Sequence, residues 1–226
     1  NLEGADLRGA KLMGADLRDT RLSGARFGGA DVRKATFSTW ISGADFTGAV
    51  FSLETVWGDH PPPHGALGPN ARADMAKLDD VLAEGLDLYR ADLVGASLRG
   101  ADLSKSMLSE ADLSEVFAPG VQLVDAQLVK ARMQRARFAG ASFARADLSG
   151  ANLHAADLTE ASLAGTNLTA ADLSGATLTG VIADRKTVSP LPRVRTPCSC
   201  NHIKARSSSF VMSRTPLVFR KASCVN

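Results

Sequence analysis

Large apolar residues recur at every fifth position from the start of the chain to about Ala183, as in ADLRG, AKLMG and ADLRD over residues 5–19. On an α-helix, five residues advance the face by about 140°, so the leucines would scatter around the helix. Within each unit a small residue precedes the large one by two positions, so both point to one side of an extended segment. The polar or glycine pair that follows favours a turn. Each unit is therefore predicted to be a short strand and a corner, with one side buried.

This A(D/N)LXX pattern resembles the pentapeptide-repeat family and extends over most of the chain. The resemblance implies an all-β fold, a right-handed quadrilateral β-helix (solenoid). Four units would form one square coil of twenty residues, with the large residue on the axis and the small one beside it at the wall. We call the large residue of each unit its centre.

The repeats divide into two blocks. The first, residues 1–56, holds eleven centres and ends with Phe46, Phe51 and Val56. A one-residue slip precedes Phe46, where Trp40 occupies a small-residue position, and this predicts a bulge or displaced corner. The second block, residues 88–184, keeps its register over twenty centres. At Val116 and Ala118 the large and small residues exchange places, a swap that roughly conserves core volume.

Residues 57–87 are predicted to be an insert, a proline-rich loop followed by one short helix. The run 71–84 has apolar Met75, Leu78, Val81 and Leu82 at helical spacing. Asn70, just before the run, suits a helix N-cap, and Gly85, just after it, suits a C-terminal stop. The short helix is expected to lie against the side or over an end of the first block.

The C-terminal tail, residues 185–226, loses the repeat and is rich in Pro, Ser and Arg, so it is predicted to be disordered. An out-of-frame or artificial end would also explain the abrupt change. The chain begins at Asn1 in mid-repeat, and solenoids need caps. Either preceding residues are missing or this coil end pairs with a second chain, which would form a homodimer.

Charge is divided unevenly along the chain. The net charge is +2, but the tail has nine Lys or Arg and no acid, which leaves 17 basic and 24 acidic residues before it. All three cysteines lie in the tail, so the repeats hold no disulfide and a reducing, cytoplasmic location is expected. No apolar run has the length of a membrane span, and membrane association is not expected.

Two sets of polar side chains are candidate sites. Aspartate and asparagine precede many centres, and we interpret them as outward groups that suit tight backbone rather than as metal or acid–base sites; they are Asp92, Asp102, Asp112, Asp147, Asn152, Asp157, Asn167 and Asp172. With twenty residues to a coil, Arg132 would interrupt the acids of one such column. A basic cluster could hold a phosphate or an acidic partner, but solvated charges balanced by neighbouring acids are the favoured interpretation; it comprises Lys130, Arg132, Arg135, Arg137 and Arg145.

Metal and catalytic sites have little support in the sequence. His60 and His64, and in the tail Cys198, Cys200 and His202, lack the four-ligand spacing of a structural zinc site. His154, like the other three histidines, has no evident serine or cysteine partner, and no phosphate-binding glycine loop is present. We expect no catalytic, cofactor-binding or metal-binding residues, no cofactor and no enzymatic activity.

The sequence therefore predicts a non-catalytic repeat scaffold that mediates protein–protein interaction through rigid β-helix faces. The resemblance also implies an alternative, a DNA-mimicking modulator of bacterial DNA gyrase that protects it from quinolones or toxins. A DNA mimic needs a continuous negative potential, whereas the repeats carry a modest −7 and an arginine-rich middle. The expected partner is a protein, gyrase in the alternative, with no direct nucleic-acid binding by the repeats.

Overall fold

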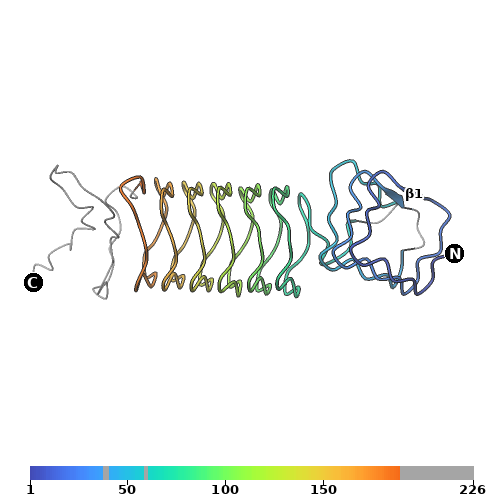
Figure 1. Ribbon diagram of the computed structural model, residues 1–226, viewed down its shortest axis with the longest axis horizontal. Helices are drawn as coiled ribbons and strands as arrows, with labels where there is room; N and C mark the ends of the chain where they lie inside the picture. The colour runs from blue at the N-terminus through green and yellow to red at the C-terminus, as the bar shows by residue number, and fades with distance from the viewer. Residues whose placement is uncertain (38–40, 59–60, 189–226) are drawn as a thin grey trace, which may run out of the picture.

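The backbone forms a stack of coils in which residues about twenty apart lie side by side. The computed structural model describes residues 1–37, 41–58 and 61–188. Parallel bridges join Asp92 to Asp112, Asp112 to Arg132 and Arg132 to Asn152, each step being one coil. Figure 1 shows these coils stacked along the long axis of the molecule, the first block at one end and the second block along the middle.

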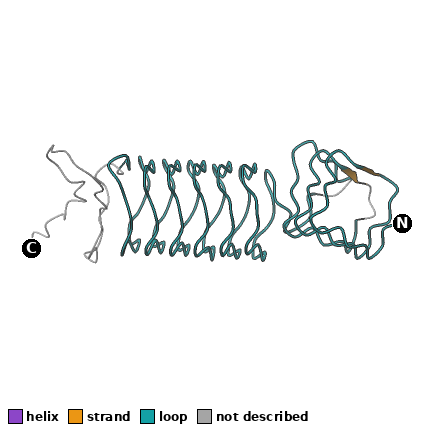
Figure 2. Cartoon of the chain, viewed as in Figure 1, coloured by secondary structure: helices purple, strands orange, loops and turns teal. Residues whose placement is uncertain are grey.

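Within the described residues, two segments are long enough to count as strands (Figure 2). β1 (Asp16–Leu17) pairs in parallel with β2 (Thr36–Phe37), in the register Asp16 to Thr36 and Leu17 to Phe37. Elsewhere in the described residues the extended part of each unit is so short that it contributes a single residue to the ladder. No helix occurs in the described ranges, and hence none that could cross a membrane.

Each unit turns through a β-turn that begins at its centre. In the unit of Leu93, the Ala96 N–H donates to the Leu93 carbonyl at 3.0 Å, and Gly95 between them has φ +65°. A positive φ at the third residue is the signature of a type II turn. We call this third residue the corner residue, and it recurs every five positions.

The core is one continuous cluster of side chains along the axis, to which the units contribute their centres and small residues, as the five-residue pattern predicts. Ala91 and Leu93, the small residue and the centre of one unit, are both almost fully buried. Val116 and Ala118 are buried together as well, so the exchange of large and small residues keeps both positions inside. In the first block aromatic centres stack directly, with Phe27 and Phe46 4.3 Å apart between ring centroids.

The expected slip in the first block is present, and a second slip corrects the register at its end. Arg26 pairs with Asp45, nineteen residues away, whereas Trp40 lies outside the described residues. The prediction that Val56 is a centre is wrong. Val56 is 49% exposed, and Trp57 is buried in its place. The unit between Phe51 and Trp57 therefore has six residues.

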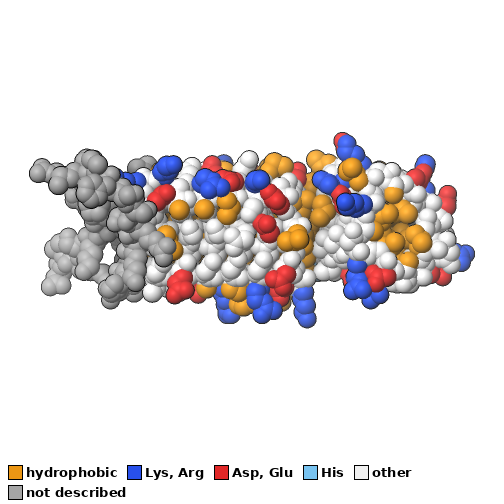
Figure 3. Space-filling view, in the orientation of Figure 1, with side chains coloured by type: hydrophobic (Ala, Val, Ile, Leu, Met, Phe, Trp, Pro, Cys, Tyr) orange, Lys and Arg blue, Asp and Glu red, His pale blue; other side chains and the backbone are white. Residues whose placement is uncertain are grey.

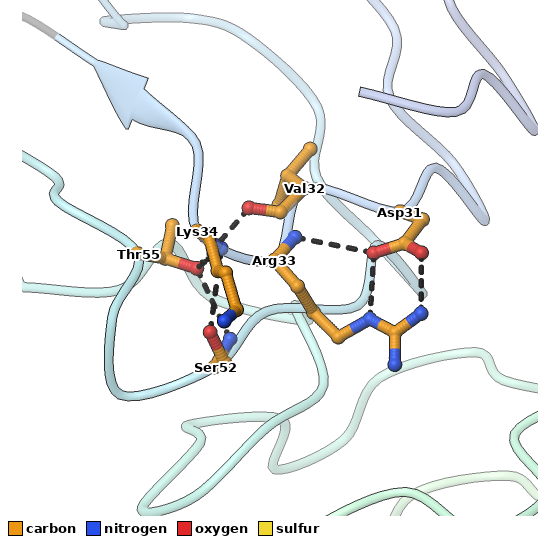
Figure 4. Close-up of polar contacts among 6 residues, drawn as sticks. All are labelled: Asp31, Val32, Arg33, Lys34, Ser52 and Thr55. Carbon is orange, nitrogen blue, oxygen red and sulfur yellow. Dashed lines mark hydrogen bonds and ion pairs between the residues drawn. The ribbon is translucent and has the colours of Figure 1, made fainter. Parts of the chain in front are cut away.

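The six-residue unit is closed by a threonine hydroxyl. Thr55 Oγ1 donates to the Val32 carbonyl at 3.1 Å and accepts the N–H groups of Ser52 and Lys34 (Figure 4). Thr187 repeats this arrangement at the far end of the second block, donating to the Leu163 carbonyl at 2.7 Å. The extra residue of each turn is accommodated because the hydroxyl satisfies backbone groups that the regular turn would pair differently.

The predicted helix over 71–84 is wrong, because this segment forms one more regular coil. Ala73 and Met75 donate their N–H groups to the carbonyls of Asp92 and Val94, both at 2.8 Å. Leu78 is buried as a centre, but Met75 is 73% exposed and Leu82 is 82% exposed. The short run fits a spacing of three and four as well as one of five, and pairing with the next coil satisfies its backbone.

The two residues assigned to the ends of that helix have other roles. Asn70 and Gly85 are both corner residues, with φ of +55° and +68°. Ala83 is a small centre beside the larger Val81, the same exchange that the sequence shows at Val116 and Ala118. The ladder thus crosses residue 87 without a break, and the other predicted boundaries stay predictions.

The irregular part of the molecule is the junction before this coil. Val50 pairs with Leu67, only seventeen residues on. A Cβ added at Gly68 would lie 2.8 Å from the ring of Phe51, so a side chain at that position would collide with it. Figure 1 shows the coils of the first block turned relative to those of the second. The predicted proline-rich loop falls here, and the tail after residue 188 lies outside the described residues.

Candidate functional site

The outward side chains form columns along the stack, since equivalent positions recur once per coil. Each unit exposes the residue before its centre and the two residues after it; for Leu93 these are Asp92, Val94 and Gly95. We call two adjacent sides of the second block side A and side B. Side A contains the centres Ala73, Leu93, Leu113, Met133, Leu153 and Leu173, and side B contains Leu78, Leu98, Ala118, Phe138, Leu158 and Leu178.

The aspartate and asparagine ladder is structural, in agreement with the interpretation from sequence. In every one of the eight predicted residues a side-chain oxygen accepts the backbone N–H two residues ahead, at 2.9–3.2 Å. Asp92, for example, accepts from Val94. These Asx turns hold the corners, which explains why a short side chain with an acceptor is needed there.

The predicted column of mixed charge on side A is also confirmed. Asp92, Asp112, Arg132, Asn152 and Asp172 follow one another through parallel bridges. Arg132 lies between acid and amide, and its Nε is 3.1 Å from a carboxylate oxygen of Asp112. No run of carboxylates long enough to form a continuous acidic column occurs on this side.

The basic cluster is largely neutralised by acids of the preceding coil. Its three paired arginines contact acids twenty residues earlier, at 2.6–3.1 Å; the pairs are Arg132–Asp112, Arg135–Glu115 and Arg145–Asp125. The hydrogen bond from the Arg145 guanidinium lowers the pKa of Asp125. Residues 110–129 carry four acids and no base, and residues 130–146 carry five bases and no acid. The favoured interpretation, charges balanced by neighbours, therefore holds for these three arginines.

Ion pairs in the first block are mostly local instead. The Arg8 side chain, helped by its own N–H, holds the pKa of Asp6 at about 2, and Arg18 does the same for Asp16. Arg33 likewise lowers the pKa of Asp31. Each pair lies within one unit, where the arginine follows the centre and the aspartate precedes it.

A shallow groove marks the boundary between sides A and B, and the sequence had not indicated it. One wall is the column of corner residues of side A, and the other is the column that precedes the centres of side B. Its lining is Met75, Gly95, Glu115, Phe117, Arg135 and Arg137. Phe117 could have indicated the groove from the sequence, because it is an aromatic residue at an outward position next to the Val116 and Ala118 exchange.

One histidine has a serine partner, contrary to the expectation from sequence. His154 Nδ1 lies 2.8 Å from Ser174 Oγ, because the two residues are twenty apart on side A. Asp172 accepts the Ser174 N–H, and the Ser174 side chain and backbone together lower the pKa of Asp172. In a catalytic triad the carboxylate is hydrogen-bonded to the histidine, whereas Asp172 contacts the serine. The arrangement is also exposed, so we assign it to packing between coils.

The remaining histidine and cysteine candidates form no metal site in the described part of the chain. His64 Nε2 lies 2.8 Å from the carbonyl oxygen of Asp74, which links the junction to the following coil. Among the described residues, no three His, Cys, Asp or Glu side chains are grouped to hold a metal ion. His60, Cys198, Cys200 and His202 lie outside them.

Known proteins with the same repeat match most of the chain. The family model described as pentapeptide repeats matches eight copies, over residues 1–38, 76–115, 122–159 and 146–182. HetL, a protein involved in heterocyst differentiation regulation from the cyanobacterium Nostoc sp. strain PCC 7120, is 32% identical, with 87% of each chain covered and a TM-score of 0.33. No curated protein sequence matches the chain.

Two further solved structures show the range of the similarity. Rfr23 from the cyanobacterium Cyanothece 51142 is 35% identical, with a TM-score of 0.31. The match covers 43% of this chain and 63% of the length of Rfr23. QnrB1, a plasmid-mediated fluoroquinolone resistance protein, is 17% identical over 76% of this chain and 81% of its own, with a TM-score of 0.40. These TM-scores are all below 0.5, so the family assignment rests on the repeat and on the 32% identity with HetL.

Proposed function

Because the chain belongs to the pentapeptide-repeat family, we propose that it is a non-catalytic scaffold that binds other proteins through the sides of its coils. We also propose that the coils wind right-handed, as they do in the family. The observation that supports a scaffold is the structural role of the polar positions that recur along the repeats. The ladder residues hold turns and most charges pair between coils, so the described residues offer surface rather than reactive groups.

The alternative, modulation of DNA gyrase through DNA mimicry, needs a continuous negative surface. The second block instead alternates acidic and basic coils, and these neutralise one another through ion pairs. Figure 3 shows side chains of both charges interspersed along the visible face. Titration of the chain into a gyrase supercoiling assay, with and without a quinolone, tests this alternative. Inhibition, or protection from the drug, would support it over the general scaffold.

Site-directed photocrosslinking tests the scaffold proposal. The crosslinking amino acid p-benzoylphenylalanine replaces, one at a time, four residues that follow the centres of a single coil, one on each side of the stack; they are Gln134, Ala139, Ala144 and Ser149. In cells that express the chain natively, we expect one discrete adduct from one side or from two adjacent sides. Adducts from no side, or the same smear from all four, would contradict a specific protein partner.

A further inference from the structure

The groove between sides A and B exposes an aromatic side chain, Phe117, beside charged residues. Phe117 lies between Ser97 and Arg137 in the ladder of side B and is 39% exposed. Met75 closes one end, and a Cβ added at Gly95 would lie 2.5 Å from its sulfur, so the thioether covers the glycine. The Met75 thioether and the Phe117 ring thus line the same groove, with Gly95 beneath the sulfur. Such a site favours an apolar, and especially an aromatic, side chain from a partner.

The charge at the other end of the groove is positive. Arg135 forms an ion pair with Glu115, with 2.8 Å between the guanidinium and a carboxylate oxygen, so these two charges neutralise each other. Arg137 has no ion-pair partner among the described residues, although Arg132 and Arg145 of the same cluster each have one. The guanidinium of Arg137 is therefore available to a carboxylate, which it can bind through two parallel N–H groups.

The length of the groove suits a short extended segment. Its corner column runs from Met75 to Arg135, three coil steps, which at about 4.8 Å per step is about 14 Å. Four residues of extended chain span about 13 Å. Side chains two apart in such a segment point the same way, about 6.6 Å from one another. An apolar residue over Phe117 would therefore place a carboxylate two positions on beside Arg137, one coil away.

We propose that this groove binds an extended segment of a partner protein in which an aromatic residue is followed two positions later by Asp or Glu. The proposal rests on the proposed scaffold function and names the chemistry of its partner. Phe117 and Met75 receive the aromatic side chain, and Arg137 receives the carboxylate.

Fluorescence anisotropy with labelled nine-residue peptides tests the proposal. The probe has a Phe-Ser-Glu core flanked by Gly and Ser, and two reference peptides carry Phe-Ser-Lys or Ala-Ser-Glu instead. We expect the probe to bind at least about fivefold more tightly than either reference, since a buried aromatic anchor and a charge-assisted pair each contribute more than about 1 kcal/mol. Its affinity should fall as salt increases.

Matched variants assign the binding to the groove. We expect F117A and R137Q each to weaken the probe at least about fivefold, and R137Q also to reduce the salt dependence. M107A and K130Q are the controls. Met107 is 41% exposed at the equivalent position on another side, and Lys130 is a base of the same cluster without an ion pair among the described residues. Both should bind like the parent chain.

Three results would overturn the proposal. The first is no binding of the probe up to about 1 mM. The second is equal binding by F117A, R137Q and the parent chain. The third is tighter binding of a labelled twelve-nucleotide oligothymidine, weakened by R137Q, which would assign the surface to nucleic acid. If the peptide does not bind but another side gives a discrete crosslink, the groove is ruled out as the binding site and the scaffold function stands. If no side gives a crosslink, the scaffold function itself is ruled out.

Discussion

The two blocks hold the same kind of corner in different ways. In the first block the corner residues are mainly glycines, such as Gly4, Gly9 and Gly14, and most of the paired arginines contact an aspartate of their own unit. In the second block many corners are charged residues with positive φ, such as Glu115 and Arg135. A non-glycine residue in this conformation costs about 1–2 kcal/mol.

The charged corners of the second block are connected to one another. Arg135 contacts Glu115 and Arg145 contacts Asp125, and all four are corner residues stacked in neighbouring coils. An unfavourable backbone conformation is thus accompanied by an ion pair between coils. A corner of this stack can therefore be either a glycine with a relaxed backbone or a charged residue that links two coils.

The centres of the two blocks differ as well. Aromatic rings contact one another across the first block, with Phe37 and Trp57 stacked 4.9 Å apart. The second block is built mainly on leucines and keeps a strict spacing of twenty residues from Arg72 to Ile182. The first block contains spacings of nineteen and seventeen. Large flat rings fill the axis even where neighbouring coils differ in length.

The largest expected effect comes from removing an aromatic centre. Phe46 contacts Phe27, Phe37 and Trp57, so F46A should cost about 3–5 kcal/mol. Urea unfolding followed by tryptophan fluorescence reports the first block, because both tryptophans precede residue 58. Circular dichroism reports all coils. We expect F46A to lower the fluorescence midpoint more than the dichroism midpoint.

The matched change in the second block is L148A, which truncates a buried leucine centre. It should cost about 2–5 kcal/mol and lower the dichroism midpoint more than the fluorescence midpoint. Equal shifts of both signals by both variants would show that the two blocks unfold as one unit, and the comparison would then have no energetic meaning.

A smaller effect is expected from a buried hydroxyl. Thr166 Oγ1 donates to the Phe143 carbonyl at 2.7 Å. T166V keeps the shape but loses this bond, which should cost about 1 kcal/mol because the Ala146 N–H still satisfies the carbonyl. T166S retains the donor and is the control. Thermal unfolding checks both, and a T166V as stable as the parent chain would deny the hydroxyl a role.

The corner conformation itself can be tested by opposite substitutions in one block. Gly140 is a corner with no neighbouring atom within 4 Å of an added Cβ, so G140A tests φ alone and should destabilise by about 1 kcal/mol. Ala155 is a corner with φ +56°, and A155G should stabilise by a similar or smaller amount. Denaturant unfolding measures both, and shifts of the same sign would contradict the strain argument.

The smallest expected effect is the acid response of the local ion pairs. The folded-state pKa of Asp6 and Asp16 is about 2, below the usual 3.8. A lowered carboxyl pKa contributes stability above about pH 4 that is lost as the pH falls to about 2. R18Q should flatten the melting temperature over this range, whereas R21Q should not, since Arg21 has no ion pair in the described residues. Parallel profiles for R18Q and R21Q would contradict the assignment.

The five-residue window of the sequence determined the repeating part of this protein. Which side chains face inward, where the corners lie and why Asp or Asn precedes a centre all follow from bonds within one unit, such as that from Val94 to Asp92. The prediction failed where a short window suited two periods, as at residues 71–84, and where a turn gained a residue before Trp57.

The twenty-residue coil was expected from the family resemblance, but only the tertiary structure decided which units lie side by side where the spacing is nineteen or seventeen, and which side chains then meet. The partner of a residue is one coil away, and a single added or missing residue shifts every contact that follows. The pairing of Arg145 with Asp125, the contact of His154 with Ser174 and the groove beside Phe117 all depend on this spacing. Local turn chemistry is set by adjacent residues, whereas the surface is set by residues about twenty apart.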